Sequence, residues 1–195
     1  KKSQETRLQI LQTAFQLIYG KGYRTTSVDE IIAGTKVTKG AFYYHFKTKD
    51  EMGLAILNEL LRPAFATQFI TPLENTENAL DRIHDLVSSL LMEDTFMTVE
   101  NGCPASNLTQ EMAPWNAEFT KTLNELSKDW EQAIINAVEK DQAKGLLKPG
   151  TDAREVAVFV LSGYWGVRNL GKLENSRTVY EVFLKGLRSY FDSLK

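Results

Sequence analysis

The stretch from Thr26 to Lys49 constrains the fold of this chain more than any other. It holds a serine three residues before Glu30, the capping-box spacing in which the two side chains accept backbone N–H groups at a helix start. Thr38 is a favourable N-cap residue for a second short helix. Between the two helix starts, Gly34 predicts that the first helix closes through a left-handed residue. The pattern therefore predicts a helix-turn-helix.

The second helix of this motif carries most of the residues that we expect to contact DNA, because the second helix of a helix-turn-helix enters the major groove. Lys39 can bind a guanine edge or a phosphate, and Gly40 and Ala41 let the backbone approach the bases. Tyrosine, histidine and lysine side chains nearby can donate to phosphates. The predicted DNA-binding residues are Thr26, Ser27, Thr38, Lys39, Gly40, Ala41, Tyr43, Tyr44, His45 and Lys49. The alternative is a small helical hairpin whose aromatic residues only form a core.

Two further helix signals flank the motif. Thr48 and Glu51 form another capping-box pair, so a third helix should begin where the second ends, with an N-terminus that attracts a phosphate. Residues 3–19 have apolar side chains at three- and four-residue steps, which predicts a first helix that ends at Gly20 and Gly22. The chain is thus expected to be all-α with about nine helices. Residues 1–47 would form a three-helix DNA-binding head, and residues 48–195 a ligand-binding and dimerisation body.

The run VTKGAFYYHFKTKDEM at residues 37–52, preceded by TSVDEIIAGTK, resembles the DNA-binding signature of the TetR family of bacterial transcriptional regulators. The family pattern is valine, a small hydroxyl residue, any residue, glycine, two or three aromatics, His or Tyr, Phe, then Ser or Thr, Lys and an acidic residue. Residues 8 to about 57 match this pattern without a gap. The rest of the chain resembles the family in length, helical pattern and helix order. The resemblance implies a homodimeric repressor or activator with an inducer pocket.

The charge distribution supports a division into a head and a body. Residues 1–50 carry nine Lys or Arg and four Asp or Glu, a net charge of +5, whereas residues 51–195 carry a net charge of −7. A basic N-terminal quarter on an acidic body is typical of a DNA-binding head whose body does not touch DNA. The single cysteine fits a reducing cytoplasm, and the polar N-terminus does not look like a signal peptide.

Proline, glycine and apolar periodicity divide the body. A helix from Thr48 should kink or end at Pro63, because proline removes a helix hydrogen bond and clashes with the preceding turn. Further helices are expected over residues 76–92 and 114–144, with an irregular region over residues 93–114 between them. Asp152 can cap the next helix.

The two C-terminal helices, from Asp152 to Gly171 and from Ser176 to Leu194, are expected to form a homodimer interface. Residues 156–167 are twelve consecutive uncharged residues, too few to cross a bilayer but typical of a helix buried on most sides. In the TetR family the corresponding helices form a four-helix bundle with those of a second subunit. Such a dimer holds two heads and implies a palindromic operator in double-stranded DNA. The alternative is that these helices complete the core of a monomer.

Cys103 is a candidate sensor. It lies in the segment Gly-Cys-Pro-Ala-Ser-Asn-Leu, and some TetR-like regulators have a similar segment that leads into a short helix beside the ligand cavity. A thiol near a helix N-terminus favours the reactive thiolate, which would make this cysteine an electrophile or oxidant sensor. The alternative is a buried, inert hydrophobic residue.

Inducer chemistry is only weakly determined by the sequence. Arg168, at the end of an apolar helix, could be a counter-ion for an anionic ligand or form a surface ion pair. His84 has no partner at metal-ligand spacing, so neither a metal nor a cofactor is expected. The candidate ligand-pocket residues, each of which could instead belong to the core, are Phe65, Phe69, Leu86, Met112, Trp115, Phe119, Trp130, Phe159, Trp165 and Arg168.

Three functions follow from these features. The leading hypothesis is a dimeric DNA-binding repressor that a small-molecule or electrophile inducer releases from its operator. An effector-free architectural DNA binder is disfavoured by the acidic body. A small enzyme with Cys103 as nucleophile would have only His84 as a base, with no group visible to activate it, so no enzymatic activity is expected.

Overall fold

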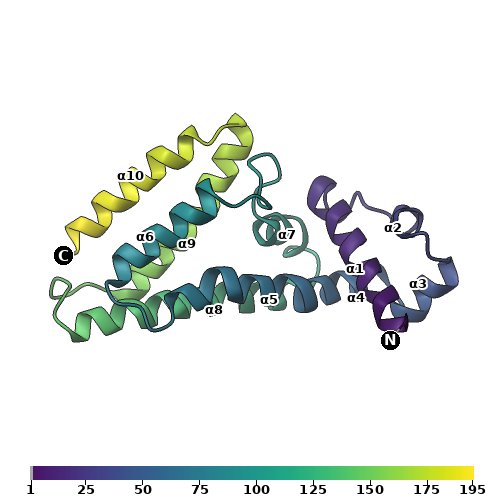
Figure 1. Cartoon of the computed structure of the whole chain (residues 1–195), viewed down its shortest axis with the longest axis horizontal. Coiled ribbons are helices and arrows are strands. Elements are labelled where there is room, and N and C mark those ends of the chain that lie inside the picture. The colour runs from purple at the N-terminus through teal and green to yellow at the C-terminus, as the bar shows by residue number, and fades with distance from the viewer. Residues whose placement is uncertain (1) are drawn as a thin grey trace. The chain divides into compact units, whose positions relative to one another are not determined.

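The computed structural model describes residues 2–195, and within that range every regular element is helical, without a strand. Helices α4 and α5 are joined by π-helical turns into one continuous helix, so the described residues form nine helical stretches (Figure 1). The all-α fold expected from the sequence is confirmed.

The residues divide into two compact units. One unit comprises Lys1–Ala64 together with Pro104–Glu125, and the other comprises Phe65–Cys103 together with Leu126–Lys195. This division differs from the expected split after residue 47, because helix α7 and the start of α8 pack with the N-terminal helices rather than with the rest of the body. We call these units the head unit and the body unit.

The head unit begins with α1 (Lys2–Lys21), α2 (Val28–Thr35) and α3 (Lys39–His45). The expected end of α1 at residue 19 is wrong by two residues, because only Gly22 takes a positive φ of 100° and Gly20 remains helical. The prediction for Gly34 is also wrong. Lys36 takes the left-handed conformation, with φ of 57°, whereas Gly34 lies inside α2. An added Cβ at Gly34 would come within 2.9 Å of the Thr13 methyl group, so glycine allows α1 and α2 to pack closely.

The third helix start is only partly as predicted. Thr48 caps α4 (Lys49–Ala55) by accepting the N–H of Glu51 at 3.0 Å. The carboxylate of Glu51, however, accepts the N–H of Lys47 at 2.7 Å rather than that of Thr48, so the reciprocal half of the capping box is shifted by one residue.

The predicted interruption at Pro63 does not occur. A π-helical segment, Ile56–Leu61, follows α4, and α5 (Arg62–Phe65) continues from it into a second π-helical segment, Ala66–Ile70. The N–H of Arg62 donates to the carbonyl of Leu57, five residues back. The helix is therefore wider where the proline enters, and wide turns of this kind are one way in which helices accommodate an interruption. The helix ends only after the 3₁₀ turn Thr71–Leu73.

The later helices start and end close to their predicted positions. Helix α6 (Ala79–Met92) starts three residues late, and the buried N–H of Ala79 donates to Asp141 at 2.5 Å, a cap supplied from far along the chain. Helix α7 (Pro104–Met112) begins directly after Cys103. Helix α8 (Ala117–Ala143) starts after Asn116, whose side chain accepts the N–H groups of residues 118 and 119 at 3.1 and 3.2 Å.

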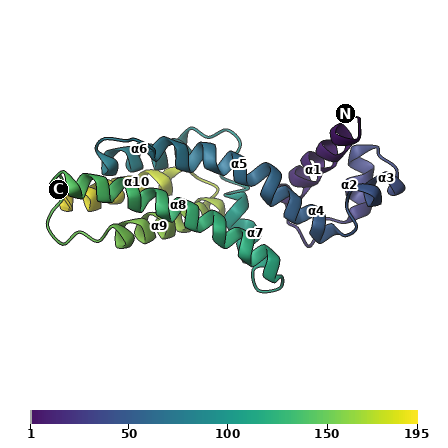
Figure 2. The ribbon, with the colours of Figure 1, turned by 90° about the horizontal axis from the view of Figure 1, so that it is seen from below.

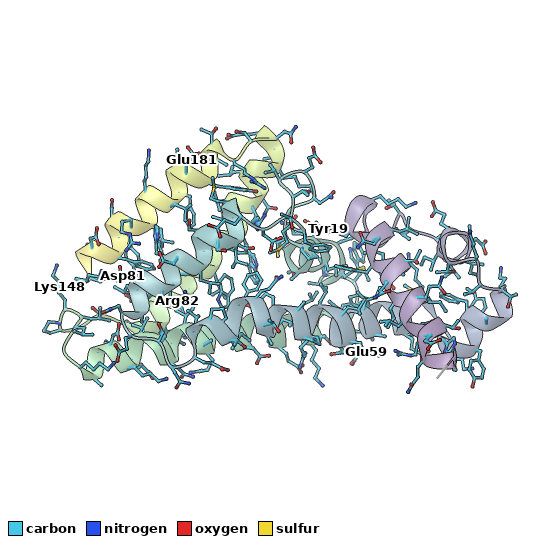
Figure 3. All side chains as sticks on the ribbon, in the orientation of Figure 1. Tyr19, Glu59, Asp81, Arg82, Lys148 and Glu181 are labelled. Atoms are coloured by element: carbon cyan, nitrogen blue, oxygen red, sulfur yellow. The ribbon has the colours of Figure 1, made fainter. Side chains whose placement is uncertain are left out.

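Helices α9 (Ala153–Glu174) and α10 (Thr178–Ser193) complete the body unit. Asp152 caps α9 as expected, accepting two backbone N–H groups. Figures 1 and 2 show α10 beside α9 and α6. Asp81 on α6, labelled in Figure 3, pairs with Arg188 at 2.5 Å and Lys195 at 2.8 Å. These ion pairs hold the C-terminal helix on α6.

The centre of the body unit is an aromatic cluster. Phe65 and Phe69 stack with ring centroids 4.2 Å apart, and Trp130 meets Phe69 edge-on at 5.0 Å and Tyr164 at 5.4 Å. All four side chains are buried. Aromatic pairs in these geometries contribute beyond the area they bury. None of the helices described is long and apolar enough to span a membrane.

Candidate nucleic-acid interface

Helix α3 presents one buried and one exposed face. Thr38 is its N-cap and accepts the N–H of Ala41 at 3.1 Å, while Phe42 is fully buried against the head. On the opposite face Tyr43 is 40% exposed and Tyr44 is 72% exposed. A large aromatic residue with that exposure is unusual for a helix whose only role is packing. The arrangement therefore favours the helix-turn-helix interpretation over a simple hairpin core.

The start of α3 is open for a close approach. An added Cβ at Gly40 would have only the Thr38 hydroxyl within reach, at 4.0 Å, so the backbone there borders open space. Lys39 is exposed, and its amine lies 3.3 Å from Asp29 on α2. An exposed ion pair of this length is weak, so the lysine can exchange it for a base edge or a phosphate.

The helix α2 start is held rigidly. Ser27 accepts the N–H of Glu30 at 3.2 Å, and the Glu30 carboxylate accepts the N–H of Ser27 at 2.8 Å, so the predicted capping box is confirmed. Lys21 also pairs with Glu30. The hydrogen bond from Lys21 and those from Ser27 lower the pKa of the Glu30 carboxyl to about 2. The Glu30 carboxylate is thus already bonded to Ser27 at the start of its own helix and to Lys21 at the end of α1.

Two of the expected DNA-binding residues face the interior of the head unit. Thr26 is 1% exposed, and its hydroxyl donates to the carbonyl of Gly22 at 2.7 Å. Lys49 is half-buried, and its amine donates to the carbonyl of Tyr23 at 2.6 Å and lies 4.3 Å from the centre of the Tyr23 ring. Burial lowers the pKa of the Lys49 amine. Thr26 does not fit a phosphate contact, and Lys49 would have to leave Tyr23 to make one.

The connection between α1 and α2 is bound on several sides. Glu111, at the end of α7, accepts the backbone N–H of Tyr23 at 2.7 Å and that of Arg24 at 2.5 Å. The Tyr23 hydroxyl donates to Asp50 at 2.6 Å, and its ring meets Phe119 edge-on at 5.2 Å. Burial, together with the hydrogen bond and the negative charge of Asp50, raises the pKa of Tyr23. These contacts explain why residues of α7 and α8 belong to the head unit.

Arg24, Lys36 and Lys47 are exposed basic residues in or beside the helix-turn-helix that the predicted DNA-binding set does not include. Lys36 occupies the left-handed turn between the two helices of the motif, and Lys47 follows α3. Both lie inside the stretch that carries the motif, so their charge and position in the sequence could have identified them as candidates for a DNA contact. Arg24 lies outside it, and only the tertiary structure shows where its side chain goes.

The ten candidate pocket residues do not form one group. Phe65, Phe69 and Trp130 belong to the aromatic cluster of the body unit, and Leu86 lines a surface cleft of about 470 Å³ in the same unit. Met112 and Phe119 are buried in the head unit. Trp165 is half-buried, and its indole N–H makes no hydrogen bond within the described residues. The remaining aromatic candidates are exposed: Trp115 by 73% and Phe159 by 46%.

Arg168 is almost fully buried, at 1% exposure, so the alternative of a surface ion pair is wrong. Its guanidinium donates to the carbonyl of Met97 at 2.8 Å, to the carbonyl of Leu90 and to the hydroxyl of Tyr164 at 3.2 Å. Leu90 lies in the last turn of α6, where the helix dipole favours a cation. Arg168 thus joins α9 to the end of α6. Tyr164, absent from the predicted set, connects this arginine to the aromatic cluster.

Cys103 lies where the sequence places it, immediately before the first residue of α7, and is 2% exposed. It lies close enough to Tyr164 of the aromatic cluster for the charge of a Cys103 thiolate to affect the Tyr164 hydroxyl. Burial, and secondarily the charge of that thiolate, raises the pKa of the Tyr164 hydroxyl. His84 is half-buried between helices, with its ring nitrogen 3.1 Å from the carbonyl of Leu184. Among the described residues no group of side chains is arranged to hold a metal ion.

Comparisons with known proteins agree with this architecture. Residues 10–56 match the family model for bacterial regulatory proteins of the tetR family, and residues 79–187 match the model for the tetracyclin repressor-like C-terminal domain. An uncharacterized HTH-type transcriptional regulator from Lactococcus lactis subsp. lactis is 30% identical over 129 residues, which is 66% of each chain. The transcriptional regulator AcuR from Cereibacter sphaeroides is 27% identical over 170 residues, 85% of this chain and 75% of AcuR.

The fold also matches solved structures along its whole length. A TetR transcriptional regulator from Chloroflexus aurantiacus has a TM-score of 0.88 at 24% identity, covering 99% of this chain and 97% of its own. The two family models together extend over both compact units, and the helix-turn-helix lies within the first match. The chain therefore belongs to the TetR family of bacterial transcriptional regulators, with a helix-turn-helix that binds DNA.

Proposed function

We propose that the protein is a homodimeric repressor that holds a palindromic operator and leaves it when a small-molecule or electrophile inducer binds. The observation that carries this proposal is the exposed face of α3, where Lys39, Tyr43 and Tyr44 surround an open glycine. A recognition helix of seven residues contacts only a short half-site, so specific binding needs two copies. Acting on bacterial DNA, such a repressor would work in the cytoplasm.

The surface of α9 and α10 supports the homodimer. Val158, Phe159 and Leu170 are each close to half exposed, Leu173 is 82% exposed and Val182 is 65% exposed. Apolar residues gathered in this way on two adjacent helices are typical of a protein–protein interface.

Two glycines support the same assignment. An added Cβ at Gly166 on α9 or at Gly186 on α10 would meet no atom within 4 Å, so both sites border open space. Helix backbones can approach most closely where glycines face each other. A second copy of the pair would bury these faces and set two heads on one palindromic operator.

The aromatic cluster and Cys103 support an inducer response. The cluster is apolar, and the buried indole N–H of its member Trp130 makes no hydrogen bond within the described residues. A ligand that binds better to a state with low DNA affinity would shift the population off the operator. Addition of the Cys103 thiolate to an electrophile such as a quinone would act in the same way, because the new C–S bond adds bulk to a buried site.

Selection of bound duplexes from a random DNA pool, with and without a quinone, tests this proposal. We expect an enriched palindrome. Its loss on quinone treatment, with retention in Cys103→Ser, would establish covalent sensing, whereas indifference to the quinone would leave a non-covalent inducer. Enrichment of a single half-site, or of no sequence, would contradict a palindromic operator. The molecular mass in solution, measured by light scattering, tests the homodimer directly.

A further inference from the structure

Arg24 and Trp115 form an exposed pair that involves residues outside the helix-turn-helix. The guanidinium carbon of Arg24 lies 5.2 Å from the centre of the Trp115 ring. Trp115 lies in the turn between α7 and α8 and is 73% exposed, so this pair stands on the surface of the head unit. A tryptophan with that exposure contributes little to the core of its unit. The Arg24 guanidinium is the one cation–π partner of its ring among the described residues.

Hydrogen bonds hold the backbone of Arg24 in place, independently of the contact between its side chain and Trp115. Its N–H donates to the carboxylate of Glu111 at 2.5 Å, and the preceding residue, Tyr23, is buried and held by Lys49. Glu111 thus binds the backbone of this connection, and within the described residues it forms no ion pair with the Arg24 guanidinium. The ring of Trp115 then limits the directions that the side chain can take. Both restraints lower the entropy lost when the arginine binds a ligand.

The guanidinium keeps its hydrogen-bonding capacity in this position. A guanidinium over an aromatic ring is attracted through its face, while its five N–H groups point outward in its plane. In the ion pairs of residues 2–195, Arg24 takes no part. An exposed, oriented guanidinium with unused donors suits a bidentate bond to a phosphate.

The position of Arg24 identifies which phosphate. It lies three residues before Ser27, the N-cap of α2, and in a helix-turn-helix the first helix crosses the DNA backbone while the second enters the groove. We propose that Arg24 binds a phosphate of the DNA backbone beside the start of α2, and that Trp115 is a positioning residue for it. The inference needs the DNA-binding head of the family but neither the homodimer nor the inducer proposed above.

The salt dependence of binding to a mixed-sequence duplex tests the phosphate contact, because such contacts do not depend on the operator sequence. We expect Arg24→Ala to weaken binding about three- to tenfold and to reduce the slope of log K against log salt by about 0.9. Arg24→Lys should restore the slope but only part of the affinity, because an ammonium cannot make the bidentate bond. Lys144→Ala, which removes one exposed charge from the body unit, is the matched control and should leave the slope unchanged. An unchanged slope in Arg24→Ala would overturn the contact.

A double-mutant cycle tests the positioning role. Trp115→Ala should weaken duplex binding about threefold in the wild-type background and have no effect in Arg24→Ala, because the ring acts only through the arginine. Trp115→Phe should keep most of the affinity, since an aromatic face remains. Because Trp115 is exposed, circular dichroism should show unchanged helix content in each variant. Equal effects of Trp115→Ala in both backgrounds would overturn the positioning role and leave Trp115 as an independent contact.

Discussion

The amine of Lys49 donates a hydrogen bond to the backbone carbonyl of Tyr23 at 2.6 Å, while the Tyr23 hydroxyl donates to Asp50, the residue after Lys49. Two residues at the start of α4 thereby bind one residue of the connection between α1 and α2. Lys49 and Asp50 hold opposite ends of the same tyrosine. The geometry of the helix-turn-helix thus depends on a lysine that its sequence context assigns to DNA.

Replacing Lys49 tests which role dominates. We expect Lys49→Ala to lower the free energy of unfolding by about 1 kcal/mol, because the carbonyl of Tyr23 loses a charged donor at a partly solvated site. Urea denaturation measures this loss. The control is Lys47→Ala, which should lower the free energy of unfolding much less, because the Lys47 amine has its acceptor, the carbonyl of Tyr43, only at 3.5 Å. The salt slope of DNA binding should stay unchanged in Lys49→Ala. A slope smaller by about 0.9 with normal stability would instead assign Lys49 to a phosphate.

Lys39 is expected to contribute to base recognition. Lys39→Ala should change the sequence enriched from a random DNA pool, because the amine can reach a guanine edge from the exposed start of α3. Tyr43→Phe should instead weaken binding to all sequences alike, since it removes only a hydroxyl that can reach a phosphate. The comparison of the two enriched motifs separates the roles. An unaltered motif in Lys39→Ala would show that this lysine does not contact a base.

The proposed homodimer would bury the exposed apolar face of α9. Phe159→Glu should convert the protein to a monomer, because a charge placed in an apolar interface loses its hydration. Leu146→Glu is the matched control, since both side chains are 46% exposed and Leu146 lies outside α9 and α10. Light scattering should therefore report a monomer only for the first variant. A dimer that persists in Phe159→Glu would place the interface elsewhere.

Glu30 should make the stability of the head dependent on acid. The folded state lowers the pKa of this carboxyl from 4.5 to about 2, through the hydrogen bond from Lys21 and those from Ser27. Its contribution is therefore complete above about pH 4.5 and is lost as the pH falls through about 2. Between pH 5 and pH 3 the melting temperature should fall less in Glu30→Gln than in the wild type. The control is Asp29→Asn, which removes a carboxylate from the same helical turn. Its melting temperature should fall over this pH range as much as that of the wild type.

Two glycines of α9 should respond in opposite ways to alanine. An added Cβ at Gly171 would come within 2.4 Å of the buried Tyr180 ring, so Gly171→Ala should destabilise the protein by about 1–3 kcal/mol. Gly166 borders open space, so Gly166→Ala should stabilise the monomer by up to about 1 kcal/mol, because alanine favours the helical conformation more than glycine does. Denaturation at a protein concentration where the monomer prevails measures both. Equal effects would mean that the Tyr180 ring moves aside without cost.

The sequence by itself determined the all-α fold, the recognition motif and the starts of α2, α3, α4 and α9, because these depend on local signals. The serine, threonine and aspartate caps at Ser27, Thr38, Thr48 and Asp152 act on backbone N–H groups two or three residues away, so spacing alone reveals them. The exposed face of α3 follows from helical periodicity once Phe42 is placed inside. Both signals lie within one or two turns of the residue that they affect.

The tertiary structure decided which of these residues are free to act. Lys49 turns inward because the folded head brings the carbonyl of Tyr23, twenty-six residues earlier, within hydrogen-bond distance. The Thr26 hydroxyl bonds to Gly22, only four residues back, but the burial of Thr26 comes from the packing of the head unit. Arg168 is a buried link rather than a surface group, because the end of α6 lies beside it. Trp115, which the sequence placed among the pocket candidates, instead contacts Arg24, more than ninety residues away in the chain. Contacts between residues so distant depend on how the helices pack, and no local pattern encodes them.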